Sequence, residues 1–399
     1  MGKDIYEKSQ KFLSTLSKNE KEIYLDNAST TPVRKEVLSA MLPYFSDEYG
    51  NPSGFSSKSQ EARKGVDTAR EIISKYCGCK SKDIIFTSGG TESINIAILG
   101  YSRLNKHKGT HIITSKVEHH AVLYCFQQLE KEGFDVTYLD VNEYGQVEPE
   151  ILEKAITEKT IFCSLIYANN EIGSINNISE LGRICKKHAV VFHTDACQAA
   201  GYLNINVNDL HVDMLTLNGS KIYGPKGIGC LYINPKITLT PLMYGGDQEK
   251  GLRPGTENVP GIIGMATALD LLQQEKEKEK KELTKLRDIL IQGILENIPD
   301  AILNGHPTQR LPFNVNVSIP GIEGEAVVLF LSEYKIYIST GAACSSGRVD
   351  PSHVILNLGR SSELAYGSLR FTLGKYTTKK DIEKVLMILP HIIHMLRNI

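Results

Sequence analysis

Short runs of β-branched and aromatic residues alternate with longer stretches of helical periodicity between about residues 84 and 233. Such alternation predicts strands joined by crossover helices, hence a mostly parallel, doubly wound sheet in an α/β fold. Ligands bind in that architecture beyond the carboxyl ends of the strands. Seven runs are predicted as strands: 83–87, 111–114, 136–139, 160–165, 190–194, 214–217 and 229–233.

The pattern changes near residue 265. Residues 275–281 are charged with alternating sign, which predicts a solvated helix that leads out of the first domain. An α+β pattern follows, with a period-two run, an apolar stretch, two short strands and a final helix at 314–319, 326–331, 336–338, 368–372 and from Lys379.

These changes predict three parts of the chain. Residues 1–20 form an N-terminal extension, in which apolar residues recur at helical spacing and favour packing on the smaller domain. Residues 21–264 form the large domain with the main sheet. Residues 265–399 form a smaller α+β domain that carries the loop around Cys344.

Composition narrows the function classes. Hydrophobic residues make up 41% and charged residues 23%, and 45 Lys and Arg against 46 Asp and Glu give a net charge of −1. This balance favours an ordinary globular chain over a protein that binds nucleic acid directly. No apolar run approaches the ~20 residues of a membrane helix, and the start lacks a signal-peptide core. We predict a cytoplasmic protein with no membrane contact.

The eight cysteines are spread along the chain, which favours reduced thiols. Four of them lie in apolar segments and are predicted to be buried: Cys125, Cys163, Cys185 and Cys230. Cys77 and Cys79 form a single pair without a second pair at zinc spacing, so no metal site is predicted. Cys344 differs, because it lies among small residues where a thiol is accessible and reactive, or else is an inert loop cysteine.

Polar residues with possible chemistry follow several of the predicted strands. Lys221 comes after strand 214–217 among glycines, where burial would lower the pKa of its amine for imine formation, although a surface lysine is the alternative. Asp195 ends strand 190–194 and could protonate a pyridine nitrogen or cap a helix. Gly90 and Thr91 precede an apolar helix and suit a phosphate.

These motifs occur in one order, and together with others they resemble those of cysteine desulfurases of the iron–sulfur-cluster-assembly branch. That branch belongs to the class V aminotransferases, which are pyridoxal-phosphate enzymes of fold-type I. The resemblance extends from about residue 22 to the end. The segments that carry it are 24–32, 50–53, 87–93, 117–119, 169–173, 195–198, 220–227, 253–256, 341–344 and 369–371.

The resemblance implies pyridoxal 5′-phosphate as the cofactor. Lys221 would form the imine, Asp195 would bind the pyridine nitrogen, and His119 would stack on the ring and relay protons. From the residues alone, His119 and the adjacent His120 cannot be distinguished. The remaining cofactor ligands implied are Gly90, Thr91, Asn170, Gln198, Ser220 and Thr256, the last from a second subunit of a homodimer.

The same resemblance implies L-cysteine as the substrate. Arg370 would bind its α-carboxylate through a bidentate fork, with help from Asn170. Cys344 would take the sulfur as a persulfide, release L-alanine and pass the sulfur to an acceptor such as an iron–sulfur cluster scaffold. Two segments depart from the family pattern: Ser220 replaces a histidine before the lysine, and residues 54–58 replace a serine-histidine segment.

Three other functions fit parts of this pattern. A class V aminotransferase would need no nucleophilic Cys344, whereas a selenocysteine lyase would share most of the site. A noncatalytic sulfur-relay scaffold would keep the fold without the chemistry. The presence of Lys221, Asp195, His119, Cys344 and Arg370 together favours a desulfurase.

Overall fold

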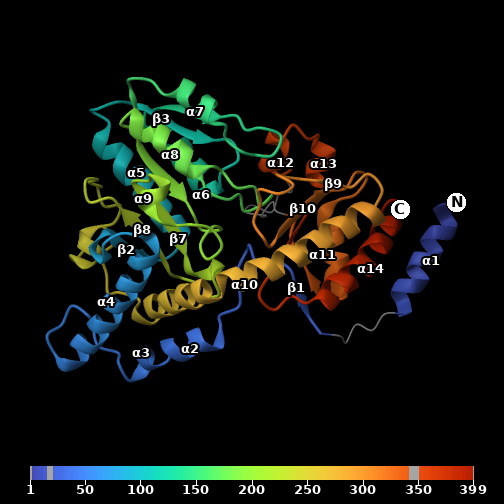
Figure 1. Ribbon diagram of the computed structural model, residues 1–399, viewed down its shortest axis with the longest axis horizontal. Helices are drawn as coiled ribbons and strands as arrows, with labels where there is room; N and C mark the ends of the chain where they lie inside the picture. Colours follow the sequence, from blue (N-terminus) through green and yellow to red (C-terminus); the bar gives the residue numbers. More distant parts are fainter. Residues whose placement is uncertain (1, 16–20, 341–349, 399) are drawn as a thin grey trace.

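The computed structural model describes residues 2–15, 21–340 and 350–398. Figure 1 shows a larger lobe built around one sheet, a smaller lobe at the other end, and the long helix α10 running between them. No helix within these three ranges is long and apolar enough to cross a membrane.

The larger lobe contains a seven-stranded sheet, as predicted. Its strands, in spatial order, are β2 (Ile84–Thr87), β8 (Gly229–Ile233), β7 (Met214–Asn218), β6 (Val191–Asp195), β5 (Thr160–Ile166), β3 (His111–Ser115) and β4 (Asp135–Leu139). Strand β8 runs antiparallel to both of its neighbours, and every other neighbouring pair is parallel. The predicted α/β class and mostly parallel sheet are therefore confirmed.

Helices cover both faces of this sheet. Successive residues of its strands therefore enter different hydrophobic cores. Ile112 packs with Ile98 and Phe126 in one core, whereas the next residue, Ile113, lies in the other. Runs that are apolar at every position are typical of strands buried on both faces. The helices of this lobe are α2 (Lys35–Met41), α3 (Pro43–Ser46), α4 (Ser57–Cys77), α5 (Gly90–Asn105), α6 (His120–Lys131), α7 (Pro149–Ala155), α8 (Ile178–Lys187) and α9 (Val207–Leu210).

Helix α10 (Val259–Asn297) contains the charged stretch that predicted a helix. It packs against α2 and α4 of the larger lobe and against α14 of the smaller one. The residue at which the sequence pattern changes, 265, lies inside this helix and is fully buried. One continuous helix therefore belongs to both lobes.

The smaller lobe has two short sheets and several helices. Strand β10 (Asn314–Ser318) pairs antiparallel with β9 (Ile302–Leu303) and β12 (Ser368–Thr372), and β1 (Ile23–Tyr24) pairs parallel with β11 (Ile336–Tyr337). The predicted strands and the predicted final helix are present. The helices of this lobe are α11 (Gly324–Glu333), α12 (His353–Asn357), α13 (Ser362–Tyr366) and α14 (Lys379–Leu396). Three short 3₁₀ turns, η1 (Ser81–Asp83), η2 (Gly219–Lys221) and η3 (Gln248–Gly251), belong to the larger lobe.

The N-terminal helix α1 (Gly2–Thr15) lies along α14 (Figure 1). The Phe12 and His391 rings stack with centroids 4.2 Å apart. The Ser9 hydroxyl and His391 Nδ1 are 3.2 Å apart, at hydrogen-bonding distance. Leu13 is buried in the core that α14 also lines. This helix therefore contacts the smaller lobe through an apolar stripe and through polar contacts, which include a hydrogen bond from the Tyr334 hydroxyl to the Leu13 backbone oxygen at 3.4 Å.

Candidate active site

A cavity of about 370 Å³ lies where the ends of β5, β6 and β7 meet the amino end of α5 and residues of the smaller lobe. It brings together eight residues that the sequence singled out: Gly90, Thr91, His119, Asn170, Asp195, Gln198, Lys221 and Arg370. It is also lined by residues with no predicted role, among them Ala28, Ser29, Glu118, His120, Glu171, Cys197, Asn218, Ser339 and His353.

Lys221 ends η2, the turn that follows β7. Its Nζ donates a hydrogen bond to the backbone oxygen of Ser29, from the segment after β1. Burial lowers the pKa of the Lys221 amine below its ordinary value, and the nearby Arg370 charge lowers it further. A lysine with a lowered pKa is a better nucleophile and base at neutral pH.

Asp195 is the last residue of β6 and is only 5% exposed. Its Oδ1 accepts a hydrogen bond from the backbone N–H of Cys197 at 2.9 Å. Gln198, one turn further on, donates from Nε2 to the backbone oxygen of Ala28 at 2.9 Å. The structure therefore holds a buried carboxylate at the strand end, which a cationic N–H group would complement.

The amino end of α5 forms another wall of the cavity. Gly90 is its first residue, and Gly89 before it has a φ of 155°, which L side chains rarely adopt. A Cβ on Gly90 would lie 2.8 Å from the Cys197 sulfur, so only glycine fits there. Helix amino ends carry unpaired N–H groups and a partial positive charge, which suits an anion near Thr91.

His119 caps the amino end of α6, and its Nδ1 accepts from the backbone N–H of Ala121 at 3.1 Å. In the neutral ring the proton is therefore on Nε2. Desolvation lowers the pKa of His119, although the Asp195 carboxylate opposes that effect. The neighbouring His120 ring instead lies 4.8 Å from the His353 ring. The fold thus distinguishes the two histidines, which the sequence did not.

Two acids in the cavity wall were not predicted as site residues. Burial raises the pKa of Glu118 to about 8, although hydrogen bonds from Ser115 and the Ile166 N–H act against it. Burial also raises the pKa of Glu171 to about 7, with the Ser352 hydroxyl donating at 2.5 Å. Both acids belong to motifs seen in the sequence, but nothing in the sequence indicated their burial.

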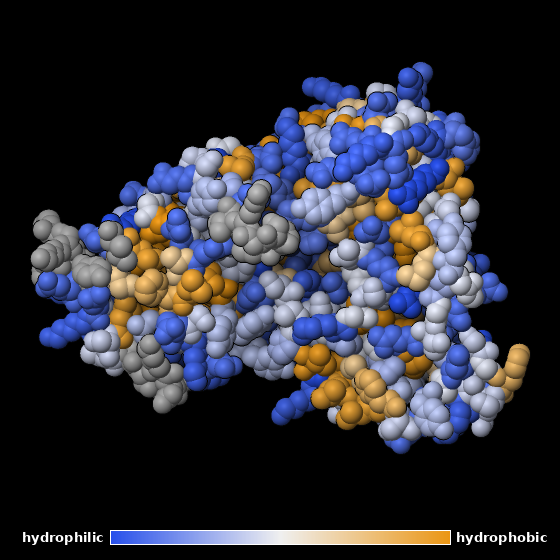
Figure 2. All heavy atoms as spheres, turned by 180° about the vertical axis from the view of Figure 1, so that it is seen from behind, coloured by the Kyte–Doolittle hydropathy of each residue, from blue (hydrophilic) through white to orange (hydrophobic). Residues whose placement is uncertain are grey.

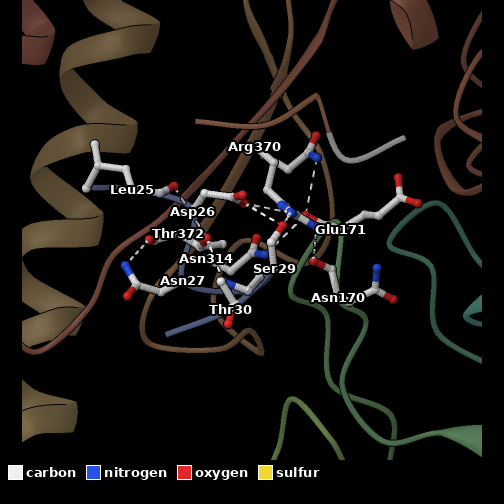
Figure 3. A network of polar contacts seen from close by, with 12 residues as sticks. Leu25, Asp26, Asn27, Ser29, Thr30, Asn170, Glu171, Asn314, Arg370 and Thr372 are labelled. Carbon is white, nitrogen blue, oxygen red and sulfur yellow. Dashed lines mark hydrogen bonds and ion pairs between the residues drawn. The ribbon is translucent and has the colours of Figure 1, made fainter. Parts of the chain in front are cut away.

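Arg370, on β12, is held by three protein groups (Figure 3). Its Nη1 donates to the backbone oxygen of Asn170 at 3.1 Å. Its Nη2 donates to Asp26 Oδ1 at 2.9 Å and to the Ser29 hydroxyl at 2.7 Å. Its Nε is buried and has no hydrogen-bond partner among the described residues. Within the described chain, the guanidinium therefore reaches the cavity with two of its five N–H hydrogens unused, one on Nε and one on Nη1.

Of the predicted site residues that the structure describes, two do not line this cavity. The Ser220 hydroxyl donates to Asn218 Oδ1 at 3.2 Å, and it is Asn218 that faces the cavity. Thr256 is exposed, in the segment between η3 and α10. Cys344 and the rest of 341–349 lie outside the described residues. His353, among the described residues that follow, lines the cavity, and its Nε2 donates to the Glu118 backbone oxygen at 3.0 Å.

Comparisons with known proteins place the chain in one family. Residues 23–385 match the family model described as aminotransferase class-V. The chain is 48% identical over 383 residues to cysteine desulfurase IscS of Methanosarcina thermophila, covering 96% of this chain and 95% of the relative. It is 50% identical over 379 residues to cysteine desulfurase IscS of Dictyoglomus turgidum, covering 95% and 96%.

Solved structures agree with this assignment. A NifS-like protein superposes with a TM-score of 0.88 at 35% identity, covering 94% of this chain and 99% of that one. A structure described as SspA in complex with cysteine superposes with a TM-score of 0.80 at 35% identity, covering 89% and 100%. The chain therefore belongs to the class V aminotransferase family, in the branch whose members are named cysteine desulfurases.

Proposed function

We propose that this protein is a pyridoxal-phosphate-dependent cysteine desulfurase, which converts L-cysteine to L-alanine and leaves the sulfur as a persulfide on Cys344. The observation that carries the proposal is that Lys221, Asp195 and Arg370 line one cavity. An amine, a buried carboxylate and a buried guanidinium are the groups that a carbonyl cofactor and an amino-acid substrate require. The names of the relatives indicate which reaction of the family is performed.

The donors and acceptors of the cavity fit pyridoxal phosphate. Lys221 offers an amine for the aldehyde, and Asp195 offers an acceptor for a protonated pyridine nitrogen. Gly90 and Thr91 offer the helix amino end for the phosphate. The volume of about 370 Å³ is also within the range of small-molecule sites. Asn170 and Gln198 would complete the contacts, beside the ring hydroxyl.

When bound, the cofactor supplies an electron sink for the electron pair left at the substrate Cα. Lys221 Nζ takes the Cα proton, since its lowered pKa leaves more of the amine in the neutral form. Asp195 would hold the pyridine nitrogen of the bound cofactor in the protonated form, because a buried carboxylate stabilises an adjacent cation. His119 lines the cavity and carries its proton on Nε2, because Nδ1 accepts from the Ala121 N–H, so its role would be to relay that proton.

Arg370 binds the α-carboxylate of the substrate, with Asn170 as its neighbour on the cavity wall. A guanidinium matches a carboxylate through two parallel hydrogen bonds, which fixes the orientation of the amino acid. Burial strengthens that contact, because Arg370 is only 4% exposed. The substrate Cα and thiol are thereby directed toward Lys221 and the cavity interior.

The Cys344 thiolate attacks the sulfur of the substrate. The substrate C–S bond breaks, a new S–S bond forms, and the electron pair of the broken bond remains on the substrate Cβ, which takes up a proton. The Cys344 sulfur is oxidised and the substrate carbon is reduced. The products are L-alanine and a persulfide on Cys344, so atoms and electrons balance without another reactant.

We also propose a homodimer in the cytoplasm that passes sulfur to an iron–sulfur cluster scaffold. Leu38, Leu42 and Phe45 are exposed, and Figure 2 shows hydrophobic side chains gathered at the lower edge of the larger lobe, around α2 and α3. A second copy would cover such a surface. Exposed Thr256 would then be free to reach the phosphate of the cofactor in the other subunit. Ser220 would contact the cofactor phosphate of its own subunit.

The proposal is tested by incubating the cofactor-loaded protein with L-cysteine and measuring alanine, sulfide and protein-bound persulfide together. We expect alanine in step with persulfide, and mass spectrometry should find the added sulfur on the peptide that contains Cys344. Cys344→Ser should keep the bound cofactor but lose alanine formation from cysteine.

Cys79→Ser is the matched control, since Cys79 is a partly exposed thiol that does not line the cavity. It should behave as the wild type. Sulfur found on Cys77, Cys79 or Cys197, with Cys344→Ser fully active on cysteine, would overturn the proposal. Activity of Cys344→Ser on L-selenocysteine alone is compatible with it, because selenium leaves more readily than sulfur.

A further inference from the structure

We propose that Asp26 is a positioning residue for Arg370. Its carboxylate pairs with Arg370 when no substrate is bound, and the substrate carboxylate displaces it from Nη2. The inference rests on the proposed function, because it assumes a substrate with an α-carboxylate. Asp26 belongs to the segment 24–32, which the family resemblance marked but to which it assigned no role. Figure 3 shows Asp26 and Ser29 turned toward the guanidinium from one side.

The first argument is the number of donors on Arg370. A guanidinium presents two forks to a carboxylate, Nε with Nη2 and Nη1 with Nη2, so both forks need Nη2. Asp26 Oδ1 and the Ser29 hydroxyl already take both hydrogens of Nη2. In the part of the chain that the structure describes, Nε has no partner and Nη1 makes one bond, to the Asn170 backbone oxygen. A substrate can therefore bind bidentately only if a group at Nη2 leaves.

The second argument is that Asp26 can leave at low cost. The Asp26 backbone is fixed by a β-bridge to Thr372, and the side chain of the next residue, Asn27, donates to the Thr372 backbone oxygen at 2.8 Å. The Asp26 carboxylate therefore leaves Arg370 by rotation of its side chain, without movement of the backbone. The Asp26 side chain is 20% exposed, against 5% for Arg370. Its Oδ1 also accepts from the Ser29 hydroxyl at 2.8 Å. The displaced carboxylate therefore keeps a donor and gains water.

The third argument is electrostatic. A buried guanidinium without an anion is costly, so Arg370 needs a partner between turnovers. Of the described residues, Asp26 is the one that forms an ion pair with it. Asp26 thus stabilises the empty site and competes with the incoming carboxylate. The two effects have opposite signs, which separates this role from a purely structural one.

The test compares Asp26→Asn with the wild type, both loaded with cofactor. L-alanine and ethylamine are the probes, since they differ by the carboxylate. Asp26→Asn should bind L-alanine about fivefold more tightly or better, because the competitor has lost its charge. Ethylamine should bind within about twofold of the wild type. The melting temperature without ligand should fall, and the rise produced by saturating L-alanine should grow.

Asp140→Asn is the control, because Asp140 is an exposed carboxylate that also pairs with one cation, Lys116. It should change neither probe. Weaker binding of L-alanine by Asp26→Asn would show that Asp26 only orients Arg370, and equal changes for both probes would show a general loss of structure. Either result overturns the inference. Failure of the proposed function would appear separately, as a wild type that forms no alanine from cysteine.

Discussion

Arg370 and Arg310 are both almost fully buried in the smaller lobe, 4% and 3% exposed, yet their surroundings differ. Arg310 makes five hydrogen bonds that involve all three of its nitrogens. The acceptors are the backbone oxygens of Ile172, Asn304, His306 and Asn314 and the side-chain oxygen of Asn314. Arg370 has an ion pair and two further bonds to described residues, which leaves two of its five N–H hydrogens unused there.

The difference teaches how to separate a structural arginine from one that binds a ligand. Arg310 joins segments of the chain through neutral carbonyls, and burial together with the Arg287 charge lowers its pKa to about 9. It remains charged at neutral pH but has no donor to offer. Arg370 lines a cavity and is paired with a carboxylate that another carboxylate can replace. Unused capacity beside a cavity indicates function.

The largest effect is expected for Arg370→Ala. The substrate carboxylate would lose its buried cationic partner, so kcat/KM for L-cysteine should fall about 1,000-fold. Alanine formation measured against cysteine concentration gives this ratio, and the absorbance of the bound cofactor checks that the site is intact. A decrease of less than about threefold would mean that Arg370 does not bind the carboxylate.

Arg310→Ala should instead reduce stability. Five hydrogen bonds, four of them buried, would be lost, so the free energy of unfolding should fall by about 3 kcal/mol or more. Urea unfolding measures it, and kcat per folded molecule should stay within about twofold. Arg310→Lys, with three donors, should lose less stability and provides a measurable case if Arg310→Ala does not fold. Wild-type stability in both variants would show that Arg310 is not a structural arginine.

Arg370→Lys tests charge against geometry. The ammonium keeps the positive charge but lacks the planar fork, so kcat/KM for L-cysteine should fall by about 10- to 30-fold, between the wild type and Arg370→Ala. The same alanine assay measures it. Activity equal to that of Arg370→Ala would mean that the fork provides all of the binding, and wild-type activity would mean that charge suffices.

The smallest effect concerns Glu171. Burial raises the pKa of this acid to about 7, although the Arg370 charge acts in the opposite direction. The folded chain keeps a proton that the unfolded chain releases above about pH 4.5. Stability therefore falls as pH rises from about 4.5 to 7. Between pH 4.5 and 7, the melting temperature of Glu171→Gln should fall by about 2–4 °C less than that of the wild type. A variant as pH-dependent as the wild type would exclude an ionising Glu171.

Local patterns in the sequence predicted the seven strands, because strands buried on both faces are apolar throughout. They also predicted that Lys221 and Asp195 follow strands whose carboxyl ends meet at one edge of a sheet. Eight predicted residues line one cavity for that reason. The family resemblance rests on the same short segments, which are contiguous in the chain and therefore visible without the fold.

Only the tertiary structure decided which distant groups meet. Asp26 and Arg370 are 344 residues apart, and Ser352 and Glu171 are 181 apart, so no local pattern relates them. The raised pKa values of Glu118 and Glu171 come from burial, which depends on packing from both lobes. Residue type and spacing determine strands and turns through local sterics. The partner of a buried charge is determined by long-range packing, which the sequence encodes only as a whole.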